Sequence, residues 1–281
     1  MEELRGMPVV KHIAEDITAR MEKLAEHGVV PTLAVIRVGA REDDLSYERG
    51  LTKRFGSVGA GVVSKVLDEN VTFEELKKVI IECNEDAGIH GILLFRPLPK
   101  HIDEKQVCEL VDPRKDVDCM CLSNIAHTFI QDKQGHEPCT AQAVMELLDY
   151  YGYDLTGKNV VVIGRSMVVG KPLAMMLQKK NATVTMCHTK TVNIAELCKK
   201  ADIICACAGA PKMVTSDYMS EGQVVIDVGI NVVDGNLCGD VDYDAALGKV
   251  AAATPVPGGV GTVTTSVLLM HTVNSAEKSV E

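Results

Sequence analysis

The sequence predicts an α/β protein with two domains, because two series of alternating strands and helices are separated by a stretch without either periodicity. Short apolar runs alternate with amphipathic segments over residues 8–112, and again from about residue 140 onward. Residues 113–138 show no clear period, so we expect loop and linker there. Alternation of this kind favours parallel βαβ units in both parts.

Hydrophobic periodicity places the elements of the first series. Apolar residues recur on one helical face from Val10 to Leu24, so residues 8–26 are predicted to form an amphipathic helix. Thr72 followed by Glu75 is a capping box, which marks the start of a helix running to about residue 86. The other predicted elements are strands at 33–38, 61–67 and 89–95 and helices at 44–55 and 103–111.

The second series begins with a helix and then repeats the strand–helix alternation. Thr140 is the predicted N-cap of a helix over 141–151. The segment PVPGGVG at 255–261 breaks all regular structure, and a final helix follows it to about residue 276. Strands are predicted at 159–163, 183–187, 202–207 and 224–228, with helices at about 171–180 and 193–200.

Composition and charge exclude several classes of protein. The chain has 281 residues, is 46% hydrophobic and 24% charged, and carries a net charge of −10, which disfavours nucleic acid and anionic membranes as partners. No apolar run approaches the ~18 residues that span a bilayer, and the N-terminus lacks a signal-peptide core, so we expect a cytoplasmic protein. The ten cysteines are scattered, so we expect buried reduced thiols and no metal site.

The stretch from Lys158 to Pro172 predicts a nucleotide site. Residues 159–163 form a short apolar run, Gly164 allows a tight turn, and Gly170 opens a helix. A strand, a glycine turn and a helix N-terminus place backbone N–H groups where a pyrophosphate can bind. The spacing G-x-S-x-x-x-G meets the common dinucleotide fingerprint only in part.

The end of the next strand favours NADP over NAD. Sites that prefer NAD usually place an acid there to bind the ribose 2′-hydroxyl. Here the strand ends Cys187-His188-Thr189-Lys190, and Arg165 follows the first glycine. Hydroxyl and cationic groups suit a 2′-phosphate better, although NAD stays open as the alternative.

Ten separate strings resemble the methylenetetrahydrofolate dehydrogenase/cyclohydrolase family along nearly the whole chain. They include RPLPKHIDE (96–104), DPRKDVD (112–118), GRSMVVGKP (164–172), VVIDVGIN (224–231) and TPVPGGVGTVT (254–264). The resemblance implies an N-terminal α/β folate-binding domain (1–139 plus 260–281), a C-terminal Rossmann-like NAD(P)-binding domain with a parallel sheet (140–259), and a cleft between them. It also implies a homodimer formed through the Rossmann-like domain, with tetrahydrofolate derivatives as substrates.

The resemblance assigns roles to individual positions. Tyr47 matches the tyrosine that stacks on the folate, and Asp118 matches the aspartate that holds the pterin ring, so these two are the catalytic candidates. The loop from Pro255 to Gly259 matches one that lines the cleft. The full predicted substrate set is Tyr47, Leu98, Asp118, Pro257, Gly258 and Gly259. The predicted cofactor set is Gly164, Arg165, Ser166, Gly170, Thr189, Gly209 and Ile230.

Three positions depart from the family pattern. Leu51 stands where the family has a catalytic lysine, Phe95 where it has the supporting glutamine, and Cys119 where it usually has a glycine. Lys53 lies two residues further along the helix and is turned roughly 200° away, so it should not replace the lysine. Leucine and phenylalanine cannot carry a proton, so we expect dehydrogenase activity with cyclohydrolase activity lost or very weak.

Two alternatives stay open at this point. A fully bifunctional enzyme would need another residue in place of the lysine, and a non-catalytic folate or nucleotide binder would need no turnover. Basic residues could also meet the acidic tail of folate, although a solvated helix face explains them equally simply. Those residues are Arg49, Lys53, Arg54 and Arg96.

Overall fold

The computed structural model describes residues 1–132 and 134–280, which divide into two compact units. Unit 1 comprises Met1–Lys11 and Pro138–Thr264, and unit 2 comprises His12–Glu137 and the chain from Thr265 onward. Residues 1–11, which we expected with the first domain, belong to unit 1. The reason is strand β1 (Glu2–Glu3), which pairs in parallel with β11 (Ala252–Ala253) at the edge of that unit's sheet.

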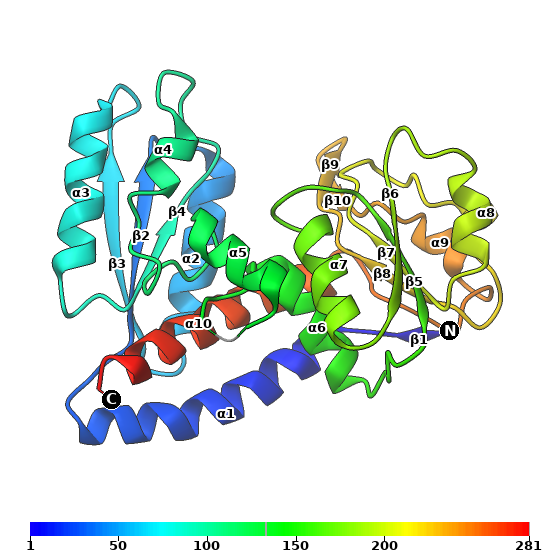
Figure 1. Ribbon diagram of the computed structural model, residues 1–281, viewed down its shortest axis with the longest axis horizontal. Helices are drawn as coiled ribbons and strands as arrows, with labels where there is room; N and C mark the ends of the chain where they lie inside the picture. The colour runs from blue at the N-terminus through cyan, green and yellow to red at the C-terminus, as the bar shows by residue number, and fades with distance from the viewer. Residues whose placement is uncertain (133, 281) are drawn as a thin grey trace. The chain divides into compact units, whose positions relative to one another are not determined.

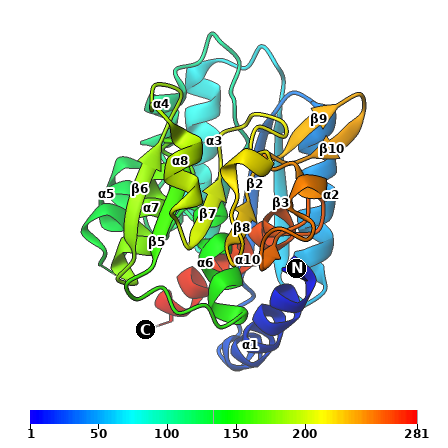
Figure 2. The same ribbon diagram turned by 90° about the vertical axis from the view of Figure 1, so that its right-hand side faces the viewer.

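Unit 1 is built on a six-stranded parallel sheet in the order β1-β11-β8-β7-β5-β6. Figure 2 shows β6, β5, β7 and β8 next to one another. The inner strands are β5 (Asn159–Ile163), β7 (Ile203–Ala206), β8 (Val224–Asp227) and β11, and β6 (Thr183–Cys187) lies at the edge opposite β1. The helices are α6 (Cys139–Tyr150), α7 (Gly170–Lys179), α8 (Ile194–Lys199) and α9 (Tyr243–Ala246).

Continuous apolar runs in the sequence form the inner strands of the sheet. All residues of β7 and β8 are buried, and so are the last four of β5, as expected for strands covered on both faces. In β6, exposed and half-buried positions alternate, and only the last residue, Cys187, is buried. The predicted strand–turn–helix order around residue 164 is observed, and it follows β5, which lies between β7 and the edge strand β6.

Unit 2 contains a three-stranded parallel sheet in the order β3-β2-β4 (Figure 1). The strands are β2 (Thr32–Val38), β3 (Gly61–Leu67) and β4 (Gly91–Leu94). The helices are α2 (Glu42–Gly56), α3 (Phe73–Glu85), α4 (Glu104–Cys108) and α5 (Leu122–Ile130). Two longer helices, α1 (Gly6–Glu26) and α10 (Val260–Lys278), have residues in both units.

One face of this sheet packs against α3 and α4. Ile36 and Leu94 of the sheet share a buried cluster with Ile80 of α3 and Val107 of α4. The capping box predicted for α3 is confirmed, because Thr72 and Glu75 exchange both hydrogen bonds.

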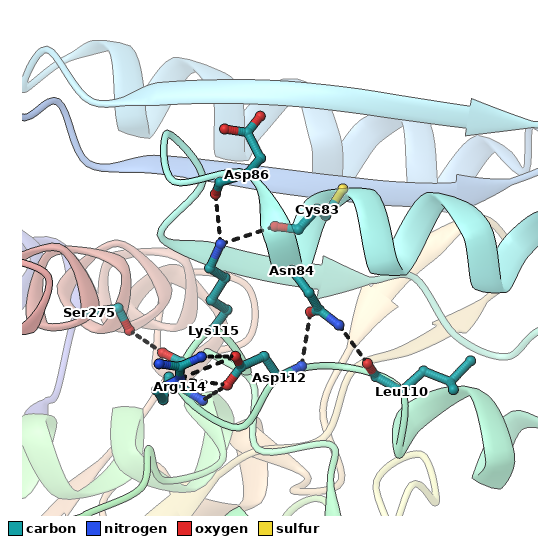
Figure 3. Close-up of polar contacts among 8 residues, drawn as sticks. All are labelled: Cys83, Asn84, Asp86, Leu110, Asp112, Arg114, Lys115 and Ser275. Carbon is teal, nitrogen blue, oxygen red and sulfur yellow. Dashed lines mark hydrogen bonds and ion pairs between the residues drawn. The ribbon is translucent and has the colours of Figure 1, made fainter.

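A polar network connects the end of α3 to the loop before Asp118 (Figure 3). The Lys115 ammonium donates to the carbonyls of Cys83 (3.1 Å) and Asp86 (2.7 Å), where a cation complements the helix C-terminus. Burial lowers the pKa of Lys115. On the other side of the loop, Ser275 of α10 donates to the Arg114 carbonyl (2.9 Å). The loop that leads to Asp118 is thereby fixed at both sides.

Two local predictions were wrong. Residues 122–130, expected in a linker, form α5, which buries Asn124 and Thr128 rather than an apolar stripe. Helix α6 begins at Cys139 with Pro138 as its N-cap, so Thr140 is inside the helix. A hairpin of β9 (Asn231–Val233) and β10 (Asn236–Cys238) was not predicted at all.

Candidate functional site

The turn after β5 is as tight as the glycine pattern indicates. Gly164 has φ of 127°, and a Cβ there would lie 2.2 Å from the Cys207 carbonyl oxygen. A Cβ at Gly170 would lie 2.3 Å from the Gly164 carbonyl oxygen. A side chain at Gly164 would push apart the loops that follow β5 and β7, and one at Gly170 would push the start of α7 away from the turn after β5. These two strands are neighbours, with β6 on the far side of β5, so the turn lies where the strand order reverses.

The start of α7 provides donors for an anion. The Ser166 hydroxyl accepts from the backbone N–H of Val169 (3.1 Å) and Gly170 (3.4 Å), and so ties the turn after β5 to the first residues of α7. The N–H groups of residues 165–168 donate to no other residue in the described part of the chain. Arg165 and Ser166 are exposed. Such a helix N-terminus fits a pyrophosphate.

The ends of β5 and β6 add cations at the same edge of the sheet. Ile163 is paired in register with Cys187, which brings Arg165, Thr189 and Lys190 to the carboxyl ends of adjacent strands. All three are exposed, and none of residues 188–191 is acidic. The residues present therefore fit a dinucleotide that carries a 2′-phosphate.

Two buried aspartates, which sequence reasoning missed, hold the loops at this edge. Asp240 is fully buried and accepts hydrogen bonds from the backbone N–H of Ala208 (2.6 Å), Gly209 (2.9 Å) and Ala210 (2.9 Å). It also accepts from the Asn231 amide (2.9 Å). The predicted cofactor residue Gly209 is thus positioned by a carboxylate from 31 residues further along the chain.

Asp227, at the end of β8, is the second of these carboxylates. It accepts from the N–H groups of Gly229 (3.0 Å), Asp240 (2.9 Å) and Val241 (2.9 Å). Burial outweighs these bonds and raises the pKa of Asp227 to about 6. A Cβ at Gly239 would lie 1.8 Å from an Asp227 oxygen, so only glycine allows the chain to pass this close. In the sequence, Asp227 lies in VVIDVGIN and Asp240 in GDVD (239–242), two of the ten strings that resemble the family, but neither string indicates burial.

A pocket of about 210 Å³ in unit 1 brings several predicted residues together. Ile230 lines it with Pro257, Gly258 and Gly259, so one predicted cofactor contact adjoins three predicted substrate contacts. Ile230 itself is 65% exposed and available to a ligand.

In unit 2 the structure brings together Tyr47 and Phe95, and separately Asp118 and Arg96. The Tyr47 and Phe95 rings meet edge to face with centroids 5.7 Å apart. The Arg96 guanidinium lies 3.5 Å from the Asp118 carboxylate. Because Phe95 and Arg96 are consecutive, the two pairs are linked through the segment that follows β4.

Leu51 is completely buried, one helical turn after Tyr47 on α2. Phe95 is 7% exposed, so the two residues that we expect at the family's lysine and glutamine positions are both enclosed apolar side chains. Lys53 is exposed, in agreement with its expected orientation away from Leu51. Leu98 is buried, and its N–H donates to Glu104 (3.1 Å).

Asp116, another residue that sequence reasoning missed, shapes the segment around Asp118. It is fully buried and accepts from the N–H groups of Met120 and Cys121 and from the Asn124 amide (2.8 to 3.0 Å). Cys119 lies inside this segment with φ of 58°, a left-handed conformation that explains the glycine of the family pattern. Burial raises the pKa of the Cys119 thiol, so it is not a thiolate.

The described residues contain neither a metal-binding cluster nor a membrane-spanning helix. Within residues 1–132 and 134–280, no group of three or more His, Cys, Asp or Glu side chains could hold a metal ion. Over the same residues, no helix has the length and apolar character needed to cross a membrane.

Comparison with known proteins agrees with the resemblance over both units. Residues 4–118 match the sequence model "Tetrahydrofolate dehydrogenase/cyclohydrolase, catalytic domain", and residues 138–280 match "Tetrahydrofolate dehydrogenase/cyclohydrolase, NAD(P)-binding domain". "Bifunctional protein FolD" of Clostridioides difficile is 48% identical over 98% of this chain and 96% of its own length. Its name favours the bifunctional alternative over the loss of cyclohydrolase activity that we expected.

Solved structures give the same result. The bifunctional FolD methylenetetrahydrofolate dehydrogenase/cyclohydrolase of Campylobacter jejuni has a TM-score of 0.96 at 38% identity, covering 99% of each chain. The corresponding enzyme of Trypanosoma brucei, solved with NADP and an inhibitor, has a TM-score of 0.93 at 37% identity, covering 99% of this chain and 97% of its own. The predicted α/β architecture with a parallel-sheet nucleotide domain is confirmed.

Proposed function

This chain belongs to the tetrahydrofolate dehydrogenase/cyclohydrolase family, and we propose that it oxidises 5,10-methylenetetrahydrofolate to 5,10-methenyltetrahydrofolate with NADP⁺. The observation that carries this proposal is the turn from Gly164 to Gly170, whose close packing leaves backbone donors at the start of α7. In unit 2, the aromatic ring of Tyr47 and the carboxylate of Asp118 support folate as the second substrate.

The protein's part in this reaction is to hold two reactants in place. When bound, NADP⁺ would supply the hydride acceptor for the folate methylene carbon, whose adjacent nitrogen would stabilise the resulting cation. Tyr47 would stack on the folate, and Asp118 would accept hydrogen bonds from the pterin. Orientation of this kind can lower the activation free energy by ~7–11 kcal/mol. No protein group has to move a proton.

NADP rather than NAD is proposed because cations, and no acid, follow β6. Arg165 and Lys190 would contact the 2′-phosphate from neighbouring strand ends, with the Thr189 hydroxyl between them. The NADP bound to the Trypanosoma brucei enzyme supports the same choice. NAD has no 2′-phosphate, so both cations would be left without a partner.

Hydrolysis of methenyltetrahydrofolate is the second candidate function, favoured by the names of the bifunctional relatives. That step adds water and moves protons, and a positioned acid or base commonly contributes 10²–10⁴-fold. The buried side chains of Leu51 and Phe95 can supply none of this. If the chain hydrolyses its product efficiently, the proton must be carried by a group other than residues 51 and 95.

Assembly and domain boundaries also belong to the proposal. We propose a homodimer formed through the Rossmann-like domain, in the cytoplasm, with the folate domain comprising most of residues 1–139 and 260–281. A purely regulatory binder is disfavoured because Tyr47, Asp118 and the glycine turn are all present.

Two assays on one purified sample test the function. Oxidation of methylenetetrahydrofolate is followed with NADP⁺ and with NAD⁺ in turn, and methenyltetrahydrofolate hydrolysis is followed without cofactor. We expect turnover with NADP⁺ at a kcat/KM at least tenfold above that with NAD⁺. Absence of turnover with both cofactors would end the dehydrogenase proposal. A hydrolysis rate equal to the oxidation rate would establish the second candidate.

A further inference from the structure

Arg96 and Asp118 form an ion pair between two half-sheltered side chains. Each side chain is 23% exposed, and the closest N–O distance is 3.5 Å. Arg96 follows Phe95, whose ring contacts Tyr47, so the pair belongs to the segment that carries the proposed folate site. It lies entirely within unit 2.

The Arg96 guanidinium retains unused donors. A distance of 3.5 Å is long for a charge-assisted hydrogen bond, which is normally 2.7–2.9 Å. Among the described residues, the guanidinium donates no hydrogen bond, whereas Arg20, whose side chain is similarly sheltered at 20% exposure, donates to Glu277 at 2.8 Å. A guanidinium has five N–H donors in a planar fork. A sheltered guanidinium with its donors unused, beside a proposed ligand group, indicates a ligand that supplies acceptors.

The pterin ring of folate presents a matching edge. Its 2-amino group and N3–H are donors, and the 4-oxo group beside N3 is an acceptor. A carboxylate accepts from the two donors, and an adjacent cationic donor is then needed for the oxygen. Asp118 with Arg96 next to it supplies this order of groups: acceptor, acceptor, donor.

We propose that Arg96 is a specificity-determining residue that donates to the pterin 4-oxo group while Asp118 accepts from N3–H and the 2-amino group. The inference rests on the proposed folate site. A 4-amino pterin would place a donor against the guanidinium, leaving both groups unpaired. It also lacks the N3–H that Asp118 accepts, so Asp118 contributes a separate part of the preference that does not depend on Arg96. Hydrogen bonds to charged groups are strong enough for the 4-oxo ligand to bind about 10- to 100-fold more tightly than the 4-amino ligand.

Binding of two ligands tests this. Dissociation constants are measured by calorimetry for tetrahydrofolate and for 4-amino-4-deoxytetrahydrofolate. The proteins are the unmodified chain and the variants Arg96→Leu, Arg96→Lys and Arg96→Gln. The preference for the 4-oxo ligand should fall at least tenfold in Arg96→Leu, and the part that remains is set by Asp118. It should recover partly in Arg96→Lys and Arg96→Gln, which keep a donor. If Arg96→Leu does not fold, the other two variants carry the same comparison.

Arg114→Leu is the matched control. Arg114 also pairs with an aspartate, Asp112 at 2.5 Å, but its side chain is 86% exposed and plays no part in the proposed site. It should leave the ligand preference unchanged.

The two proposals fail in different ways. A chain that binds neither ligand would overturn the proposed function. A chain that binds tetrahydrofolate, with the same preference in Arg96→Leu as in the unmodified chain, would overturn only the role of Arg96. Equal affinity of the unmodified chain for both ligands would do the same.

Discussion

Replacing Leu51 with lysine and Phe95 with glutamine tests whether these two positions limit hydrolysis of methenyltetrahydrofolate. Leu51 lies one turn after Tyr47, so a lysine there would extend on the helix face that carries the folate tyrosine. The glutamine would provide a polar neighbour for the ammonium in place of an aromatic ring. We expect the double variant to hydrolyse methenyltetrahydrofolate ~10²–10⁴-fold faster than the unmodified chain, the range for a restored acid/base group.

Burial sets the cost of the change. Leu51 has no exposed surface, so its removal loses about 1.5–3 kcal/mol of hydrophobic burial. The new ammonium adds a desolvation penalty of several kcal/mol unless it is paired. Leu51→Lys alone should therefore destabilise the fold by roughly 3–5 kcal/mol, a large part of the ~5–15 kcal/mol available to a typical domain. Phe95→Gln loses the edge contact to Tyr47, about 0.5–1.5 kcal/mol.

The assay is the loss of methenyltetrahydrofolate absorbance without NADP⁺, with dehydrogenase activity measured on the same sample. Neighbouring positions couple, so the double variant should exceed the product of the two single gains. Thr52→Lys is the control, because it adds the same charge at the next, exposed position. The reasoning fails if the double variant hydrolyses no faster than Thr52→Lys.

Three further predictions concern buried ionisable groups. Asp240→Asn should raise KM for NADP⁺ about tenfold with little change in KM for folate. The reason is that the amide nitrogen would face N–H groups that now donate to a carboxylate oxygen. An unchanged KM for NADP⁺ in steady-state kinetics would contradict this prediction. Asp227 has a folded-state pKa of about 6 against 3.8 as reference, so its contribution to stability is fully present below about pH 4 and is lost as pH rises through 6. Urea unfolding should show the stability of the unmodified chain falling relative to Asp227→Asn by about 3 kcal/mol between pH 4 and 7, and a constant difference would refute this. Burial lowers the pKa of His271 to about 4 from 6.5, so its contribution to folding stability is present above pH 6.5 and is lost as pH falls. Urea unfolding should therefore show that His271→Asn loses less stability than the unmodified chain between pH 6.5 and 4.

Local signals explain why much of the fold could be predicted from the sequence. The capping box before α3 and the continuous apolar runs of β5 and β8 depend on neighbouring residues only, and all three were predicted. Helix α5 was missed because its exposed residues include Leu122 and Phe129, while polar residues face inward. Its pattern is therefore the reverse of an ordinary amphipathic helix.

The positions that shape the site were harder to predict, for a physical reason. Asp227 and Asp240 are buried with partners that include backbone N–H groups 13 to 32 residues away, and Asp116 with those of Met120 and Cys121, four and five residues away. An aspartate in a sequence carries no sign of such partners, and the usual expectation for it is a solvated surface. Leu51 was identified as a departure from the family pattern, but its complete burial is known only from the fold.

The same structural device positions the proposed contacts in both units. Asp116 holds the segment that contains Asp118, and Asp240 holds the loop that contains Gly209, each by accepting several hydrogen bonds. Hydride transfer depends on such positioning, because neither reactant needs a proton from the protein. Leu51 and Phe95 are instead held by apolar burial, and neither side chain can donate a proton at the positions where we expect the family's lysine and glutamine. We therefore expect substitutions of the buried aspartates to change oxidation, and the introduction of polar groups at residues 51 and 95 to change hydrolysis.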